Sequence, residues 1–233
     1  MPTRYCDRPV TIISVNGAAL LSSTLTDDIA HAFEHAEDLG PSTIALIHVV
    51  GCLQPSGLKT WPGPVDLQTV NKWERVLRRI ERAELTTLAV LEHHCTRLAL
   101  ELLLVVDRRI ASKSFSMTGK EPEVDIWPSM ALYRLGRQLG ESRARQFVLD
   151  STTLTAERGV DLGIIDIVSR DVGPSLQQTF TQFLQHAPPR DYPISRRLLH
   201  DCVAPSFEEM LGSHLAACDR ALRRSLSYEC TTL

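Results

Sequence analysis

Short apolar runs recur along the first part of the chain and predict the strands of a sheet. Three of them are VTIISV (10–15), STIALIHVV (42–50) and LTTLAVL (85–91). RRIASKSFSM (108–117) predicts a further strand, and the apolar segment GIIDIVS (163–169) follows later. Because helix-like stretches separate these runs, the pattern favours a parallel sheet, with ligands bound where loops leave the strand ends.

Amphipathic stretches between the apolar runs predict helices. In residues 25–40, Ile29, Phe33 and Ala36 share one helical face, and the Gly-Pro pair at 40–41 ends the helix. A longer helix is predicted over 66–84, with an apolar stripe made of Val70, Trp73, Leu77 and Ile80. Further helices are predicted over 98–107, 127–140, 141–150 and from Thr155 onward.

Two loops interrupt this pattern. GCLQPSGLKTWPGPV (51–65) is rich in Gly and Pro and predicts a long ordered loop or a flap, a kind of segment that often carries function. HHCTR (93–97) joins the strand predicted at 85–91 to the next helix. From Gln177 the chain is predicted to form helices broken by a linker at 186–195, which divides it into a core (1–176) and a helical C-terminal region (177–233).

Composition narrows the class of protein. With 233 residues and 43% hydrophobic content, the chain can bury one enzyme-sized core. The net charge is −3 and Arg is spread along the sequence, which argues against a nucleic-acid partner. The N-terminus lacks signal-peptide features and no apolar run reaches about 18 residues, so we expect a soluble cytoplasmic protein that does not interact with a membrane. The six cysteines include no CxxC pair, which favours reduced thiols over a disulfide scaffold or zinc finger.

Four segments, in order, resemble the crotonase (enoyl-CoA hydratase/isomerase) superfamily across roughly residues 10–170. They are WPGPVDL, LEHHCTRLALELLLVVDRRIAS, EPEVDIWPSMALYRLGRQLG and LTAERGVDLGIIDIVS. The resemblance implies an α/β fold, a crotonase-like spiral of β-β-α units. It also implies that the helical region from about Gln177 packs on a neighbouring subunit, in a homo-oligomer that is a trimer or hexamer.

The resemblance also implies a site for an acyl-CoA thioester. It places two backbone N–H donors for the thioester oxygen, an oxyanion hole, at Val65 and Leu98. The family usually has three glycines where this chain has the sequence RLA at 97–99, whose side chains narrow the approach to the backbone. Substrate contacts are expected at Trp61, Gly63, His94 and Trp127. No cofactor is implied beyond the CoA thioester, which is the substrate.

Acid/base chemistry next to the thioester requires carboxylates. Glu101 lies in a very apolar helical run, where a carboxylate is rarely buried without a partner or a function. The alternative for Glu101 is a structural ion pair with Arg97, one turn earlier. The second acid matches either Glu121 or Glu123, each of which could instead be a solvated loop carboxylate.

The HHC sequence at 93–95 admits three interpretations: loop packing or pocket lining, a metal site, and a Cys nucleophile with a His base. A zinc site needs further ligands at defined spacing, and the neighbouring sequence supplies none. Adjacent residues also rarely give the geometry of a nucleophile and its base. We therefore predict packing or lining and no metal site.

Within the superfamily, TWPGPVDLQTVNKWERVLRRIER and WPSMALYRL resemble DpgB-type proteins most closely. These are partners of dihydroxyphenylacetyl-CoA synthase, a type III polyketide synthase of antibiotic biosynthesis. The resemblance implies a protein that assists such a synthase by dehydrating or aromatising a CoA-bound polyketide. A stand-alone enoyl-CoA hydratase/isomerase and a non-catalytic subunit of a crotonase-like oligomer remain alternatives.

Overall fold

The structure is a computed structural model that describes residues 3–5, 8–56, 58–117, 129–150, 153–169, 187–189 and 191–201. The chain forms two compact units, Met1–Arg190 and Asp191–Leu233. The element described in the second unit is α8 (Tyr192–Asp201), which begins inside the segment predicted as a linker. Pro193 lies in its first turn, where the N–H that proline lacks has no helical partner. The predicted division at residue 176 and the oligomerisation role of 177–233 stay predictions.

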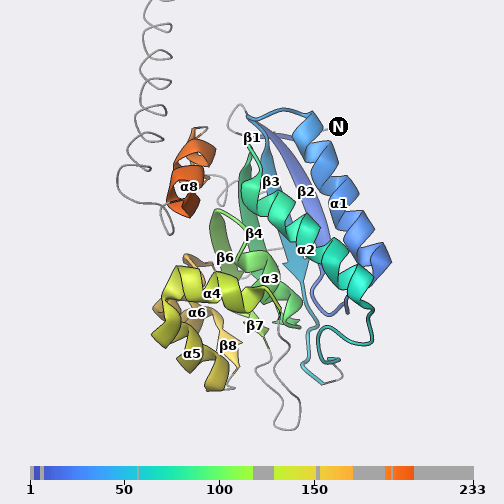
Figure 1. Cartoon of the computed structure of the whole chain (residues 1–233), viewed down its shortest axis with the longest axis vertical. Helices are drawn as coiled ribbons and strands as arrows, with labels where there is room; N and C mark the ends of the chain where they lie inside the picture. Colours follow the sequence, from blue (N-terminus) through green and yellow to red (C-terminus); the bar gives the residue numbers. More distant parts are fainter. Residues whose placement is uncertain are drawn as a thin grey trace, which may run out of the picture. The chain divides into compact units, whose positions relative to one another are not determined.

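A six-stranded sheet forms the centre of the first unit, in the order β1-β2-β3-β4-β6-β9 (Figure 1). Its strands are β1 (Thr3–Tyr5), β2 (Arg8–Asn16), β3 (Ile44–Val50), β4 (Thr86–Glu92), β6 (Arg108–Ser112) and β9 (Ile167–Ser169). Strand β1 pairs antiparallel to β2, and the remaining pairs are parallel. The prediction of a parallel sheet is confirmed.

A second, three-stranded sheet has the order β5-β7-β8. Its strands are β5 (His94–Cys95), β7 (Ser116–Met117) and β8 (Leu154–Thr155). Two predictions were wrong here: residues 93–97 contain a strand, and the strand predicted over 108–117 is divided into β6 and β7. The division lies at a turn in which Phe115 N–H donates to the Ser112 carbonyl at 3.0 Å. In β4-β5-α3, a strand of the large sheet is followed by a strand of the small sheet and then by a helix. This is the β-β-α unit that the family resemblance implied.

The helices of the first unit follow the amphipathic stretches. They are α1 (Ser23–Asp38), α2 (Leu67–Arg82), α3 (Leu98–Leu103), α4 (Ala131–Leu139), α5 (Glu141–Leu149) and α6 (Ala156–Leu162). Ser22 and Asp66 cap the first two, since their side chains accept the N–H groups of Leu25 and Thr69. Helix α3 ends four residues before the predicted limit because Asp107 turns back to β4, where its carboxylate accepts the Thr87 N–H at 2.9 Å.

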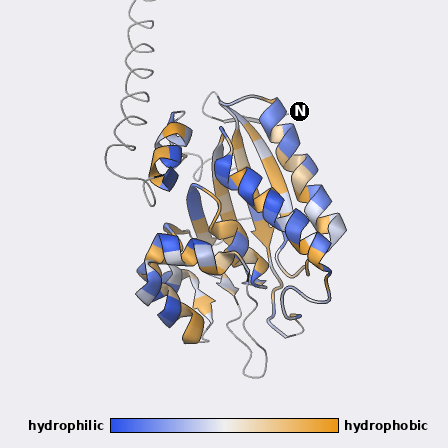
Figure 2. Ribbon diagram, in the orientation of Figure 1, coloured by the Kyte–Doolittle hydropathy of each residue, from blue (hydrophilic) through white to orange (hydrophobic). Residues whose placement is uncertain are grey.

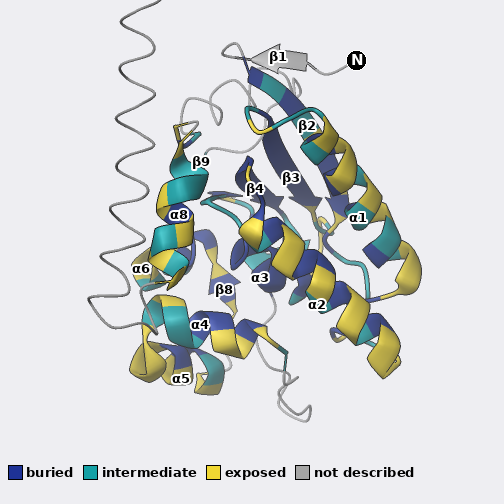
Figure 3. Ribbon diagram, turned by 45° about the horizontal axis from the view of Figure 1, so that its top comes forward, coloured by how far each residue is buried: buried dark blue, intermediate teal, exposed yellow. Residues whose placement is uncertain are grey.

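Helices α1 and α2 lie side by side along one face of the large sheet (Figure 1). Their apolar residues face the sheet and their charged residues face outward (Figure 2), and the side toward the sheet is buried (Figure 3). Strand β4 is buried along its whole length, and β3 is buried except at Val50, as expected for parallel strands packed on both faces. Among the described residues, no helix is long and apolar enough to cross a membrane.

The loops that leave β2, β3 and β4 meet at the carboxyl ends of these strands. Gly51 N–H donates to the Glu92 carbonyl at 2.9 Å, and Thr96 N–H donates to the Gly17 carbonyl at 2.8 Å. A Cβ atom at Gly51 would lie 2.2 Å from the His94 carbonyl oxygen, so this crossing of two backbones requires glycine. The fold therefore fixes the starts of the 51–65 loop and of the 93–97 segment relative to each other.

Candidate active site

Glu101 is the buried carboxylate at the centre of the candidate site. Every residue of α3 is buried, and the Glu101 side chain is 2% exposed. Trp61, in the 51–65 loop, donates its indole N–H to Glu101 Oε1 at 3.2 Å, and Trp73, on α2, donates to Oε2 at 2.5 Å. Each carboxylate oxygen therefore has its own aromatic donor, and the two donors come from different parts of the chain.

The two indole rings also contact each other. Their centroids lie 6.0 Å apart with an interplanar angle of 63°, an edge-to-face arrangement that aromatic pairs favour. Trp61 is 4% exposed and Trp73 is 2% exposed, so both rings are shielded from water along with the carboxylate they bind. The pair fixes the orientation of Glu101 from the side of α2 and the loop.

The alternative interpretation of Glu101, a structural ion pair with Arg97, is not seen in the described part of the chain. Of the described ion pairs within 4.0 Å, none joins these two side chains, although Arg97 lies one turn before Glu101. The two tryptophans take the place of a cationic partner. This arrangement binds the carboxylate through neutral donors, and the charge of Arg97 interacts with an ionised Glu101 only across a distance beyond 4.0 Å.

Burial raises the pKa of the Glu101 carboxyl above its ordinary value. Hydrogen bonds from the side chains of Trp73, Ser129 and Trp61 oppose this rise, and the charge of Glu74 adds to it. Desolvation is the largest of these effects, because neutral donors replace only part of the hydration that an ionised carboxylate has in water. A carboxyl group with a raised pKa is suited to exchange protons near neutral pH.

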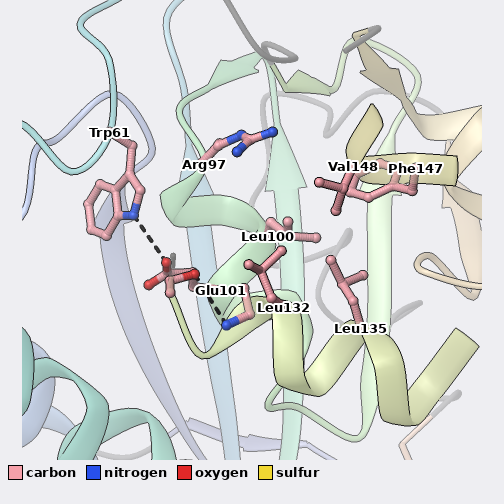
Figure 4. Close-up of a pocket in the computed structure, with 10 residues that line it drawn as sticks. Trp61, Arg97, Leu100, Glu101, Leu132, Leu135, Phe147 and Val148 are labelled. Atoms are coloured by element: carbon pink, nitrogen blue, oxygen red, sulfur yellow. Dashed lines mark hydrogen bonds between the residues drawn. The ribbon is translucent and has the colours of Figure 1, made fainter. Parts of the chain in front are cut away.

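A small cavity opens beside Glu101 (Figure 4). Residues from the 51–65 loop, from α3, and from the segment that includes α4 and α5 line it, and most of them are apolar. They are Trp61, Arg97, Leu100, Glu101, Ser129, Ala131, Leu132, Leu135, Phe147 and Val148. An apolar wall with a few polar groups is typical of small-molecule sites, and Glu101 lies where it can contact what the cavity binds.

The predicted site residues divide into three groups. Trp61 and Glu101 are brought together at the cavity, whereas Gly63 and His94 are absent from its lining. His94 contacts Ser116 of the small sheet instead, with Nδ1 2.5 Å from the hydroxyl oxygen. The predictions for Glu121, Glu123 and Trp127 lie outside the described residues.

The predicted oxyanion donors, Val65 and Leu98, lie in the 51–65 loop and at the first position of α3, and neither is among the residues that line the cavity. Val65 is half-buried at the end of the 51–65 loop, and Leu98 is fully buried at the start of α3. The Leu98 N–H has a long contact, 3.4 Å, to the Thr96 hydroxyl of its own loop. Their joint role toward a thioester oxygen stays a proposal.

Sequence reasoning missed the function of Trp73 and the distant walls of the cavity. Trp73 was assigned to the apolar stripe of a helix, but a buried indole N–H needs an acceptor. The signal that could have found it is the coincidence of this tryptophan with an unpaired glutamate in an apolar run. Phe147 and Val148 reach the cavity from α5, and nothing in their local sequence indicates this.

The HHC segment packs in the small sheet. Cys95 is fully buried, and desolvation raises the pKa of its thiol to about 12, with the charges of Cys52 and Glu92 acting in the same direction. A thiol with this pKa is protonated at neutral pH, which disfavours the nucleophile interpretation. Within the described part of the chain, no group of three His, Cys, Asp or Glu side chains is placed to hold a metal ion.

His48 and Glu92 form a second buried polar pair. Their side chains lie 2.5 Å apart, near the carboxyl ends of β3 and β4. His48 lies two residues after Leu46, and Glu92 lies two residues after Val90, so each pair shares one face of the sheet. Leu46 and Val90 belong to the apolar cluster on the face away from α1 and α2. The pair is therefore not part of the cavity and links two strands on the opposite face.

Comparison with known proteins identifies the family to which this chain belongs. The chain is 33% identical over 213 residues to a protein of Amycolatopsis orientalis named enoyl-CoA-hydratase, and the match covers 91% of this chain and 96% of that protein. No family model matches the chain. This relative, matched over almost its whole length, shows that the chain belongs to the crotonase (enoyl-CoA hydratase/isomerase) superfamily.

Solved structures confirm the fold at low sequence identity. An enoyl-CoA hydratase from Mycobacterium smegmatis aligns with a TM-score of 0.74 at 13% identity, covering 91% of this chain and 87% of that one. A putative enoyl-CoA hydratase from Thermobifida fusca in complex with acetoacetyl-CoA aligns with a TM-score of 0.69 at 17% identity, covering 92% of both chains. The expectation of a crotonase-like α/β fold is confirmed.

Proposed function

We propose that this protein processes an acyl-CoA thioester with Glu101 as its acid/base residue, and that it assists a type III polyketide synthase in making dihydroxyphenylacetyl-CoA. The observation that carries the catalytic part is the buried Glu101 carboxylate, held by two indole N–H groups at an apolar cavity. The synthase and its product come from the sequence resemblance to DpgB-type proteins. The thioester substrate is supported by the related hydratase and by the acetoacetyl-CoA complex of the T. fusca protein.

The proposed reaction is the loss of water from a CoA-bound polyketide. Glu101 takes the proton from the carbon next to the thioester, and the electron pair of the broken C–H bond moves toward the thioester oxygen. The N–H groups of Val65 and Leu98 stabilise the negative charge that develops there. Expulsion of the β-hydroxyl group, with the proton returned to it, releases water and forms the carbon–carbon double bond. Glu121 or Glu123 is the proposed second acid.

The raised pKa of Glu101 fits this role. A base works best when the pKa of its conjugate acid is close to the operating pH. Burial raises the pKa of Glu101 from its ordinary value in the direction of neutral pH. The two tryptophans keep the carboxylate oriented while the proton is transferred. The wall of the cavity is mostly apolar, which favours binding of the acyl group there.

Glu101→Gln tests the catalytic proposal. Product formation is measured with purified protein, a candidate type III synthase and malonyl-CoA, and we expect a loss of about 10²- to 10⁴-fold in the stimulated rate. Glu141→Gln, at the exposed start of α5, makes the same chemical change away from the cavity and should keep the wild-type rate. Full stimulation by a folded Glu101→Gln protein would refute the catalytic role.

A second pair of variants separates catalysis from docking. Arg75 and Arg78 are exposed on α2, and replacing both with Glu reverses the charge of that surface without touching the cavity. If the protein acts only by binding the synthase, this double variant loses stimulation and Glu101→Gln does not. Turnover of crotonyl-CoA without any synthase favours the stand-alone hydratase instead.

A further inference from the structure

The cavity beside Glu101 contains a positive charge that proton transfer at Glu101 does not need. Arg97 lines the cavity together with an apolar wall that includes Leu100, Leu132 and Val148. An apolar wall is enough to bind a plain hydrocarbon acyl chain. A guanidinium group in the same cavity adds a fork of N–H donors that an uncharged hydrocarbon cannot use.

Among the described residues, the guanidinium of Arg97 has no hydrogen-bond or ion-pair partner, and only the more distant charge of Glu101 acts on it. Its Nε atom is buried and makes no hydrogen bond to any described residue. No carboxylate of the described chain lies within 4.0 Å of its guanidinium. In Figure 4 the side chain extends toward the Val148 side of the cavity and not toward Glu101. Arg97 is therefore directed away from the carboxylate closest to it in sequence.

A half-buried cation without a partner is energetically unfavourable. Burial lowers the pKa of Arg97 because the charged form loses hydration at this position, and the charge of Glu101 offsets only part of this effect. Arginine remains charged in proteins, so the cost is not relieved by deprotonation. The backbone gives no reason for arginine here, because Arg97 precedes α3 with ordinary right-handed dihedral angles and its side chain does not cap the helix.

We infer that Arg97 is a specificity-determining residue that binds a negatively charged oxygen on the acyl group of the thioester. The inference rests on the proposed function and narrows its substrate class to acyl-CoA thioesters whose acyl group carries a carboxylate. A carboxylate oxygen supplies the acceptor that the buried Nε atom lacks. Charge-assisted hydrogen bonds of this kind are about twice as strong as neutral ones.

Binding of saturated thioesters tests the inference without turnover. Malonyl-, succinyl- and glutaryl-CoA place a carboxylate at three distances from the thioester, and the matching terminal amides have nearly the same shape without the charge. We expect the wild-type full-length chain, in titration calorimetry at pH 7, to bind at least one acid about 10- to 100-fold more tightly than its amide. Butyryl-CoA serves as the hydrocarbon reference.

Three variants assign the preference to Arg97. Arg97→Met should bind the acid and the amide equally, and Arg97→Lys should keep part of the difference because it retains the charge. Arg145→Met removes an exposed arginine of α5, the helix that also supplies Val148, and should keep the full difference. If Arg97→Met does not fold, the wild-type and Arg97→Lys comparisons still decide.

The possible failures are distinguishable. Equal binding of all acids and amides by the wild-type protein, or an unchanged preference in Arg97→Met, would overturn the inference and leave the proposed function in place. Binding of no CoA thioester, butyryl-CoA included, would overturn the proposed function itself.

Discussion

Glu101→Gln should change the pH dependence of stability as well as activity. In the unfolded chain the carboxyl group titrates at about 4.3, whereas burial raises its pKa in the folded protein. Between these two values the folded protein keeps a proton that the unfolded chain has released. The contribution of Glu101 to stability is therefore complete below the unfolded pKa and is lost as the pH rises through the folded pKa.

The size of the effect follows from this linkage. Each pH unit inside the window lowers the free energy of unfolding of the wild-type protein by about 1.4 kcal/mol, and Gln, which does not titrate, removes this slope. Gln also has one acceptor oxygen where Glu101 uses two, so one of the indole N–H groups of Trp61 and Trp73 loses its acceptor. That loss costs about 1–3 kcal/mol at every pH.

Urea unfolding at pH 4, 5, 6, 7 and 8 measures both parts. Emission of the buried tryptophans reports unfolding, and Glu141→Gln is the matched control. We expect the wild-type protein to be more stable than Glu101→Gln at pH 4, with the difference narrowing as the pH rises. A constant difference would show that folding leaves the pKa of Glu101 unchanged, and a difference that grows with pH would show that the folded site favours the ionised form. Either result would refute the assignment of desolvation as the dominant effect.

Two further predictions concern the surroundings of Glu101 and the cysteines. Both indole hydrogen bonds lower the pKa of Glu101, and Trp73→Phe removes the shorter of them. The acid limb of the pH–rate profile should therefore move to higher pH in Trp73→Phe, and further than in Trp61→Phe. Identical profiles in the wild-type protein and both variants would contradict this. Cys95 is buried with a pKa of about 12, so in the native protein at pH 8 it should resist a thiol reagent while the half-buried Cys52 reacts. Mass spectrometry maps the labelled cysteines, and the denatured chain is the control. Early labelling of Cys95 in the native protein would refute its burial.

The sequence predicted the elements that depend on local pattern. Strands β2, β3 and β4 are continuous apolar runs, and α1 and α2 have a clear apolar face, so periodicity was enough to place them. The strands of the small sheet, β5, β7 and β8, have two residues each and exist because distant segments pair with them. No local pattern of two residues can indicate such a strand.

The same distinction applies to the candidate site. Glu101 was found because a carboxylate in an apolar helix is unusual wherever it occurs. Its partners were not, because Arg97 at one helical turn is the obvious local choice, whereas the observed donors lie 28 and 40 residues away in sequence. Spacing along one helix says nothing about a side chain that another helix or loop brings to the same place.

The hydrogen bond from Trp61 to Glu101 couples the position of the 51–65 loop to the pKa of Glu101. Withdrawal of Trp61 would remove a hydrogen bond that lowers the pKa of Glu101, but it would also admit water and so reverse the larger desolvation effect that raises this pKa. Glu101 is therefore a stronger base when the loop is in place than when it is withdrawn. By the reciprocity of linked equilibria, protonation of Glu101 and docking of Trp61 against it would favour each other, so the uptake of a proton would also hold the loop in place.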